Sequence, residues 1–251
     1  MNLDVLLCDA DGNLFPSEGP AFVASAEVTN RLMADLGIER RFAAAELRGE
    51  ALGRNFRSTA LHLAARHGVS LEPPEIERYV AEERRAVTAQ LRRVLEPNPE
   101  VSEPLQRLAR RARLAVVSSS ALARLDACLR ATDLTELFPA NVRFSAEDSL
   151  PAPASKPDPA VYAFAGDALG ASPAGALAIE DAVAGVQSAV GAGFSVVGNL
   201  AFVPLEERAQ RADALLDAGA STVVRSWREL SELLGVTSQA AARAEPRARA
   251  D

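Results

Sequence analysis

Three carboxylates in this sequence have the spacing of a site for a divalent cation. Asp9 and Asp11 are two residues apart on extended or turning chain, so both side chains can point into one cleft. Two carboxylates that close repel each other unless a cation or a proton intervenes. Together with Asp181 they form an all-oxygen set that favours Mg²⁺, which keeps water and substrate phosphate among its ligands. One carboxylate could then attack phosphorus, while the other protonates the leaving oxygen and later activates water.

Two further groups could bind an anion. The run Ser118-Ser119-Ser120 ends one element and starts another, where hydroxyls and free amides at a helix amino terminus can hold a phosphate. Lys156 is the only lysine in a chain whose other basic residues are arginines, which indicates a position that needs a compact ammonium. Simpler interpretations exist for each group: a helix cap for the serines, a solvated surface charge for Lys156, and turn or capping roles for single carboxylates.

These residues lie next to the predicted elements of one parallel sheet. Six short apolar runs predict its strands: Leu3–Cys8, Leu114–Val117, Val142–Ser145, Leu177–Ile179, Phe194–Val197 and Thr222–Val224. Helical patterns alternate with them, at Ala121–Leu129, Val161–Leu169, Val183–Val190, Leu205–Leu216 and through Leu230 and Leu234. This order predicts an α/β fold, a doubly wound, Rossmann-like parallel sheet with helices on both faces. Ligands of such sheets bind beyond the carboxyl ends of the strands, where all the polar groups should converge.

A helical insert follows the first strand. From about Phe22 to Leu95, apolar residues recur at helical spacing and no convincing strand intervenes. Pro97-Asn98-Pro99 closes the insert, since adjacent prolines cannot continue a helix. We therefore predict a core over residues 1–16 and 96–236, a smaller all-helical domain over 17–95, and a disordered tail over 237–251.

The composition excludes several other classes of protein. A net charge of -7 and a pI near 5.1 disfavour nucleic-acid or anionic-membrane partners, which repel an acidic protein. Two cysteines cannot make a disulfide framework, and two histidines cannot supply a His-rich metal site. The sequence has no apolar run long enough to span a bilayer, and its first residues lack the basic region of a secretory signal. We expect a soluble cytoplasmic protein, a monomer or a homodimer.

In order along the chain, the polar groups resemble the four motifs of the haloacid-dehalogenase (HAD) superfamily. Asp9-Ala10-Asp11-Gly12-Asn13-Leu14 resembles the first motif, and Ser118 after an apolar strand resembles the second. Lys156 corresponds to the third motif and Glu180-Asp181 to the fourth. The Lys-Pro-Asp-Pro sequence and the residues after Glu180 are similar to the branch that holds β-phosphoglucomutases and small phosphatases.

The resemblance implies a role for each of these residues. Asp9 would be the nucleophile and Asp11 the general acid and base, while Ser118, Ser119 and Lys156 would bind the transferring phosphoryl group. The implied Mg²⁺ ligands are Asp9, the Asp11 backbone carbonyl and Asp181, with Glu180 assisting. The helical insert would be a cap that closes over the site and selects the substrate. Arg54, in a sequence similar to the family's cap substrate loop, would meet a second anionic group or would be a plain surface arginine.

Departures from the family pattern narrow the expected activity. The presence of Asp11 argues against carbon–halogen chemistry, because dehalogenases of the superfamily lack this second aspartate. The insert has no lysine, which argues against phosphonatases and sugar-phosphate mutases, and Ala21 occupies the position of the mutases' hinge histidine. Asn13 replaces the commoner threonine, and Pro16 replaces an aspartate at the hinge.

We therefore expect a Mg²⁺-dependent phosphatase that hydrolyses a small phosphorylated metabolite, such as a sugar phosphate, through an aspartyl-phosphate. A β-phosphoglucomutase-like mutase is the alternative enzyme, and a non-catalytic regulatory or binding protein with the same fold is the alternative outside enzymes.

Overall fold

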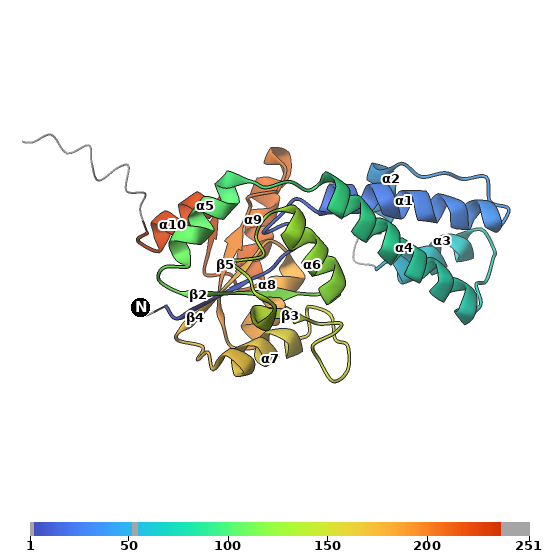
Figure 1. Ribbon diagram of the computed structural model, residues 1–251. Coiled ribbons are helices and arrows are strands. Elements are labelled where there is room, and N and C mark those ends of the chain that lie inside the picture. Colours follow the sequence, from blue (N-terminus) through green and yellow to red (C-terminus); the bar gives the residue numbers. More distant parts are fainter. Residues whose placement is uncertain (1–2, 52–54, 237–251) are drawn as a thin grey trace, which may run out of the picture. The chain divides into compact units, whose positions relative to one another are not determined.

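The computed structural model describes residues 3–51 and 55–236 (Figure 1). Its contacts divide the chain into two compact units. The core unit comprises the described residues of 1–14, 98–122 and 136–251, and the helical unit comprises those of 15–97 and 123–135. The two units are described separately below.

The core unit contains a parallel sheet. Among the described residues its six strands are β1 (Val5–Cys8), β2 (Arg113–Ser118), β3 (Arg143–Ser145), β4 (Ala176–Glu180), β5 (Ser195–Asn199) and β6 (Thr222–Val224). Their order is β3-β2-β1-β4-β5-β6, and every neighbouring pair runs parallel. All four residues of β1 are buried, as expected for a central strand covered on both faces. The predicted α/β sheet is confirmed.

Three helices cover one face of this sheet: α7 (Ala160–Leu169), α8 (Val183–Gly191) and α9 (Arg208–Asp217). Val5 and Leu7 of β1 share a buried cluster with Val161 of α7, Val186 of α8 and Leu215 of α9. Successive side chains of a strand point to opposite faces, so the residues between them face away from this cluster. The central strand therefore supplies apolar side chains to a core on each side.

The opposite face carries α5 (Pro99–Leu108) and α10 (Trp227–Leu233), which pack side by side (Figure 1). Leu177 of β4, Leu108 of α5 and Leu233 of α10 line one cavity of about 290 Å³. Helix α5 was not predicted from the sequence, in which Pro97-Asn98-Pro99 indicated only a break. Asn98 caps this helix by accepting a hydrogen bond from the Glu100 amide. Proline in the first turn is favourable because its missing N–H has no partner there.

The helical unit contains α1 (Glu18–Asp35), α2 (Ala44–Glu50), α3 (Phe56–Arg66), α4 (Pro73–Val94) and most of α6 (Leu122–Ala131). Its core joins Val28, Leu32 and Met33 of α1 to Leu63 of α3 and Tyr79 of α4. These residues repeat at helical spacing in the sequence, and each is almost completely buried. The first helix begins at Glu18, four residues before the predicted start near Phe22.

Two other predicted elements begin with a 3-10 turn. Ala140–Val142 forms such a turn before β3, and Leu205–Glu207 forms one before α9. Each turn follows a proline, Pro139 or Pro204. Apolar periodicity does not distinguish a 3-10 turn from the regular element beside it, so both predicted elements were too long at this end.

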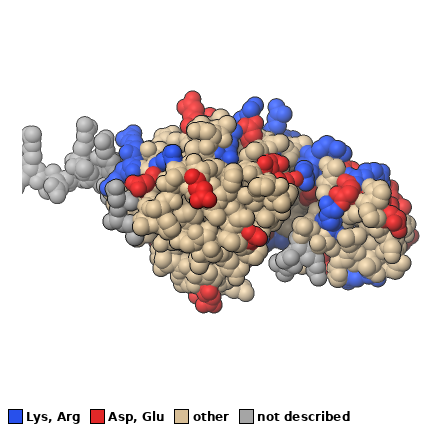
Figure 2. Space-filling view, turned by 90° about the horizontal axis from the view of Figure 1, so that it is seen from below, with Lys and Arg blue, Asp and Glu red and all other residues tan. Residues whose placement is uncertain are grey.

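The described residues include no helix with the length and apolar character needed to cross a membrane. In the view of Figure 2, acidic and basic side chains are interspersed over the surface.

Candidate active site

The carboxyl ends of three neighbouring strands meet at the candidate site. β1 lies between β2 and β4, and both pairings extend to Cys8, the last residue of β1. Asp9 follows directly, Ser118 is the last residue of β2, and Glu180 is the last residue of β4. Lys156 comes from the loop before α7. The parallel sheet thus brings together residues from distant parts of the sequence.

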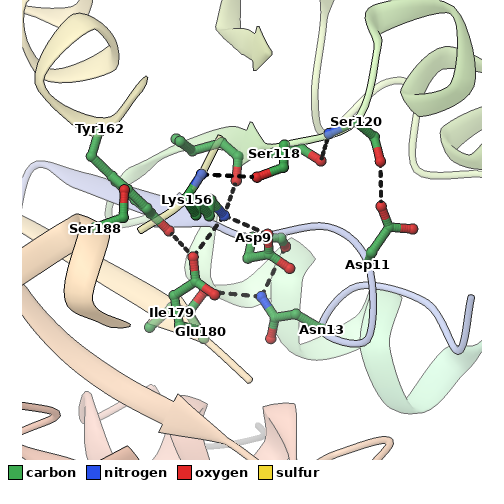
Figure 3. A network of polar contacts seen from close by, with 12 residues as sticks. Asp9, Asp11, Asn13, Ser118, Ser120, Lys156, Tyr162, Ile179, Glu180 and Ser188 are labelled. Atoms are coloured by element: carbon green, nitrogen blue, oxygen red, sulfur yellow. Dashed lines mark hydrogen bonds and ion pairs between the residues drawn. The ribbon is translucent and has the colours of Figure 1, made fainter. Parts of the chain in front are cut away.

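Lys156 connects these strand ends (Figure 3). Its ammonium donates hydrogen bonds to Asp9 Oδ1 at 2.5 Å, to Glu180 Oε1 at 2.7 Å and to the Val117 carbonyl oxygen at 2.8 Å. An ammonium has three hydrogens, so these contacts use its full donor capacity. The side chain is only 6% exposed, although it follows a run of loop residues. The alternative interpretation of Lys156 as a solvated surface charge is therefore wrong.

Burial and charge alter the acidity of this ion-pair network. Burial raises the pKa of Asp9, Lys156 opposes the change, and Glu180 adds to it, with a resulting pKa of about 7. For Lys156, burial alone would lower the pKa, but the carboxylates of Asp9 and Glu180 raise it above its usual value. Lys156 therefore remains an ammonium, and Asp9 can exist in both forms near neutral pH.

Glu180 is held from three sides. Its Oε1 accepts hydrogen bonds from Lys156 and, at 2.5 Å, from the Tyr162 hydroxyl of α7. A Cβ atom on Gly185 of α8 would lie 1.9 Å from Glu180 Oε2, so this approach requires glycine. Tyr162 and Gly185 were not predicted from the sequence as parts of the site. Their only sequence signal is their position, shortly after the lysine and the paired acids.

Asp181 is placed by a glycine and an arginine. Gly12 has a φ of 80°, and a Cβ atom there would lie 2.3 Å from Asp181 Oδ2. Arg211 of α9 donates a hydrogen bond to the Asp181 backbone carbonyl at 3.1 Å. Burial, followed by the charges of Asp9 and Glu180, raises the pKa of Asp181 well above its usual range. A buried carboxylate with this surrounding charge favours either a proton or a cation.

The donor set fits a hard divalent cation. Asp9, Glu180 and Asp181 each offer a carboxylate oxygen, and the three oxygens lie within 4.8 Å of one another. Asp181 Oδ1 is buried and has no hydrogen-bond partner among the described residues. An unsatisfied buried carboxylate oxygen is costly, and a metal ion would compensate it. The carboxylate of Asp11 lies outside this group of three, and it accepts a hydrogen bond from the Ser120 hydroxyl at 2.7 Å.

The serine run lies beside the network. The hydroxyl of Ser118 is buried and accepts a hydrogen bond from the Ser120 amide at 3.0 Å. Ser119 is exposed, and its hydroxyl accepts a long hydrogen bond, 3.4 Å, from the Lys156 amide. The Leu122 amide at the start of α6 donates a hydrogen bond to Asp148 Oδ2 at 2.6 Å. Ser118 thus contacts the turn that carries Ser120, and Ser119 contacts the loop that carries Lys156.

The remaining predicted residue, Arg54, lies outside the described residues. Cys8, which precedes Asp9, is completely buried in β1.

Comparisons with known proteins place this chain in a family. A family model for haloacid dehalogenase-like hydrolases matches residues 3–193. A HAD family hydrolase from Deinococcus radiodurans, solved with bound phosphate and sodium, is 28% identical with a TM-score of 0.66, over 93% of this chain and 96% of that chain.

Two more distant structures show the fold alone. A "putative beta-phosphoglucomutase" from Thermotoga maritima is 23% identical with a TM-score of 0.70, over 94% of this chain and 100% of that chain. A predicted phosphoglycolate phosphatase from Haemophilus somnus is 18% identical with a TM-score of 0.71, over 93% and 99% of the two chains. A search of curated proteins found no match. On the family match and the site described above, this chain belongs to the haloacid dehalogenase-like hydrolases and is an enzyme of that hydrolase family.

Proposed function

We propose that the protein is a Mg²⁺-dependent phosphatase that acts in the cytoplasm on a small phosphorylated metabolite. The observation that carries this proposal is the placement of Asp9 between an ammonium and further carboxylates. Lys156 holds one Asp9 oxygen at 2.5 Å, and Asp9, Glu180 and Asp181 present oxygens to one another within 4.8 Å. This arrangement suits a carboxylate nucleophile that works beside a cation.

The two aspartates of the first motif receive different roles. Asp9 attacks phosphorus, so that an Asp9 oxygen–phosphorus bond forms and the bond to the leaving oxygen breaks. Asp11 gives its proton to that leaving oxygen, and later removes a proton from the water that hydrolyses the aspartyl-phosphate. The hydrogen bond from Ser120 fixes the Asp11 carboxylate outside the group that includes Asp9, which supports this separation of roles.

The cation would be held by Asp9, Asp181 and the Asp11 backbone carbonyl, with Glu180 assisting. Mg²⁺, when bound, neutralises negative charge on the phosphoryl oxygens and on the nucleophile. The ligands are all oxygen atoms, and neither described cysteine belongs to the group of three, which supports a hard ion.

Ser118, Ser119 and Lys156 are assigned to the phosphoryl oxygens. The three hydrogens of the Lys156 ammonium are already bonded, so direct contact with a phosphoryl oxygen requires one of these bonds to be exchanged. The Val117 carbonyl is the partner whose loss leaves both ion pairs of Lys156 intact. By the family resemblance we assign substrate selection to the helical unit, as a cap, with Arg54 as its candidate anion contact.

The test is release of inorganic phosphate from p-nitrophenyl phosphate and from a panel of phosphorylated metabolites, with and without Mg²⁺. We expect metal-dependent release that Asp9→Asn abolishes. Asp167→Asn, which changes an exposed carboxylate of α7, is the matched control and should retain activity. Undiminished release by Asp9→Asn would remove Asp9 from its assigned role. Isomerisation of a hexose phosphate that depends on a bisphosphate, without net phosphate release, would instead identify a mutase.

A further inference from the structure

Asn13 is a buried amide at the base of the candidate site, in the turn after β1. Its side chain is 0% exposed. The Nδ2 atom donates two hydrogen bonds, to the Asp9 carbonyl at 2.9 Å and to the Ile179 carbonyl at 3.1 Å (Figure 3). One carbonyl belongs to the proposed nucleophile, and the other immediately precedes Glu180-Asp181. A single amide group thus ties the end of β1 to the end of β4.

The orientation of this amide is fixed by its partners. Carbonyl oxygens only accept hydrogen bonds, so the NH₂ group of Asn13 must face Asp9 and Ile179. Its Oδ1 then faces Asn199 at the end of β5, whose Nδ2 donates to it at 2.8 Å. Asn199 Oδ1 in turn accepts from the Ala201 amide at 3.1 Å. Flipping either side chain would place two acceptors or two donors against each other.

A fourth element is attached through the backbone of the same residue. The indole Nε1 of Trp227, in α10, donates to the Asn13 carbonyl at 2.8 Å. Trp227 is 1% exposed and Asn199 is 0% exposed, so water competes little with either hydrogen bond. Asn13 therefore links β1, β4, β5 and α10 beneath the group of carboxylates.

We propose that Asn13 is a positioning residue that sets the spacing of the Asp9 and Asp181 carboxylates for Mg²⁺. This inference rests on the proposed function. The Ile179 carbonyl accepts two hydrogen bonds, one from Asn13 Nδ2 and one from the Asp9 amide at 3.0 Å. The chain reaches Asp181 two residues later, so a shift at Ile179 moves this ligand relative to Asp9. Groups that orient metal ligands without touching the metal affect its affinity directly.

The test measures Mg²⁺ binding by calorimetry, and the unfolding temperature without metal, for the wild-type protein and three variants. Asn13→Leu removes both N–H donors at similar volume, and Asn13→Thr replaces the amide with a hydroxyl that can donate one hydrogen bond. The control, Ser231→Ala, removes a buried hydrogen bond from the Ser231 hydroxyl to the Val236 carbonyl, 2.7 Å long, in the same unit. We expect Asn13→Leu to weaken Mg²⁺ binding about tenfold or more, the usual effect of losing such a partner.

The outcomes separate this inference from the proposed function. Asn13→Thr should retain part of the affinity, and Ser231→Ala should lower the unfolding temperature without changing Mg²⁺ binding. Wild-type affinity in Asn13→Leu would overturn the positioning role, whatever its effect on stability. A wild-type protein that binds no Mg²⁺ would instead contradict the proposed function. If Asn13→Leu does not fold, Asn199→Ala tests the same link from the other side, with weaker binding expected and unchanged binding contradicting it.

Discussion

The carboxylate of Glu180 lies directly against the backbone of Gly185, and no side chain would fit between them. A Cβ atom at residue 185 would lie 1.9 Å, 2.1 Å and 2.4 Å from Oε2, Cδ and Oε1 of Glu180. In this position Glu180 accepts hydrogen bonds from both Lys156 and Tyr162 through its Oε1. The glycine in the first turn of α8 therefore leaves the space that the negative partner of Lys156 occupies.

Gly185→Ala should displace Glu180 and thereby move Lys156. A displacement of roughly 1 Å can cost about 100-fold in rate, so we expect a loss of phosphatase activity of that order. The matched control is Gly49→Ala in α2, where an added Cβ would meet no atom within 4 Å. This control should raise stability slightly, since alanine is the better helix former. Equal activity of the two variants would show that Glu180 tolerates displacement.

Tyr162→Phe removes one hydroxyl from Glu180 and leaves the ring in place. A hydrogen bond to a buried charged group contributes about 1.5–3 kcal/mol, so the free energy of unfolding should fall by that amount. Activity should fall as well, because Glu180 then depends on Lys156 alone to hold Oε1. Tyr79→Phe, which deletes a hydroxyl bonded to Asp35 in the helical unit, should alter stability but not activity. Urea unfolding and phosphate release measure the two effects.

Lys156→Met should be strongly destabilising in the absence of metal. It leaves the carboxylates of Asp9 and Glu180 buried without their cation, and breaking a buried pair costs about 3–5 kcal/mol. Arg228→Met, the comparison variant, breaks a pair with Glu100 whose side chains are 61% and 69% exposed, and should cost about 1 kcal/mol or less. Similar losses of unfolding free energy in the two variants would contradict a buried, structural ion pair at Lys156.

The metal-free protein should become less stable as the pH rises toward neutrality. The pKa of Asp9 rises from its usual 3.8 to about 7 in the folded state, so between these values the folded protein holds a proton that the unfolded chain has released. Stability falls with pH wherever the folded state binds more protons. Mg²⁺ competes with that proton and should stabilise the protein more above pH 7 than below it.

Asp9→Asn cannot titrate and should lack this part of the pH dependence. Urea unfolding of both proteins over the acid and neutral range, with and without Mg²⁺, measures the difference. Parallel pH profiles for the two proteins would place the titrating group elsewhere.

The convergence of Asp9, Lys156, Glu180 and Asp181 could be predicted from the sequence because it follows from topology. Parallel strands bring their carboxyl ends to one edge, and each short apolar run in the core marked a strand. The positions of Tyr162 and Gly185 could not be predicted in the same way. A tyrosine or a glycine at the start of a helix is equally compatible with ordinary packing, and only the three-dimensional approach to Glu180 distinguishes the two.

Other features of the fold depend on contacts that local patterns do not encode. Residues 123–135 group with the helical unit although they follow β2 of the core, and nothing in their apolar spacing indicates this partner. Asn13 was noticeable only as a departure from the family motif. Its hydrogen bond to β5 comes from Asn199, which is 186 positions away in the sequence.

The placement of Lys156 also affects how the protein can be labelled. Its ammonium is buried, triply hydrogen-bonded and held above its usual pKa, so it offers no nucleophilic lone pair to acylating reagents. Because it is the only lysine in the sequence, acylation of a lysine side chain would report that this ion-pair network has opened.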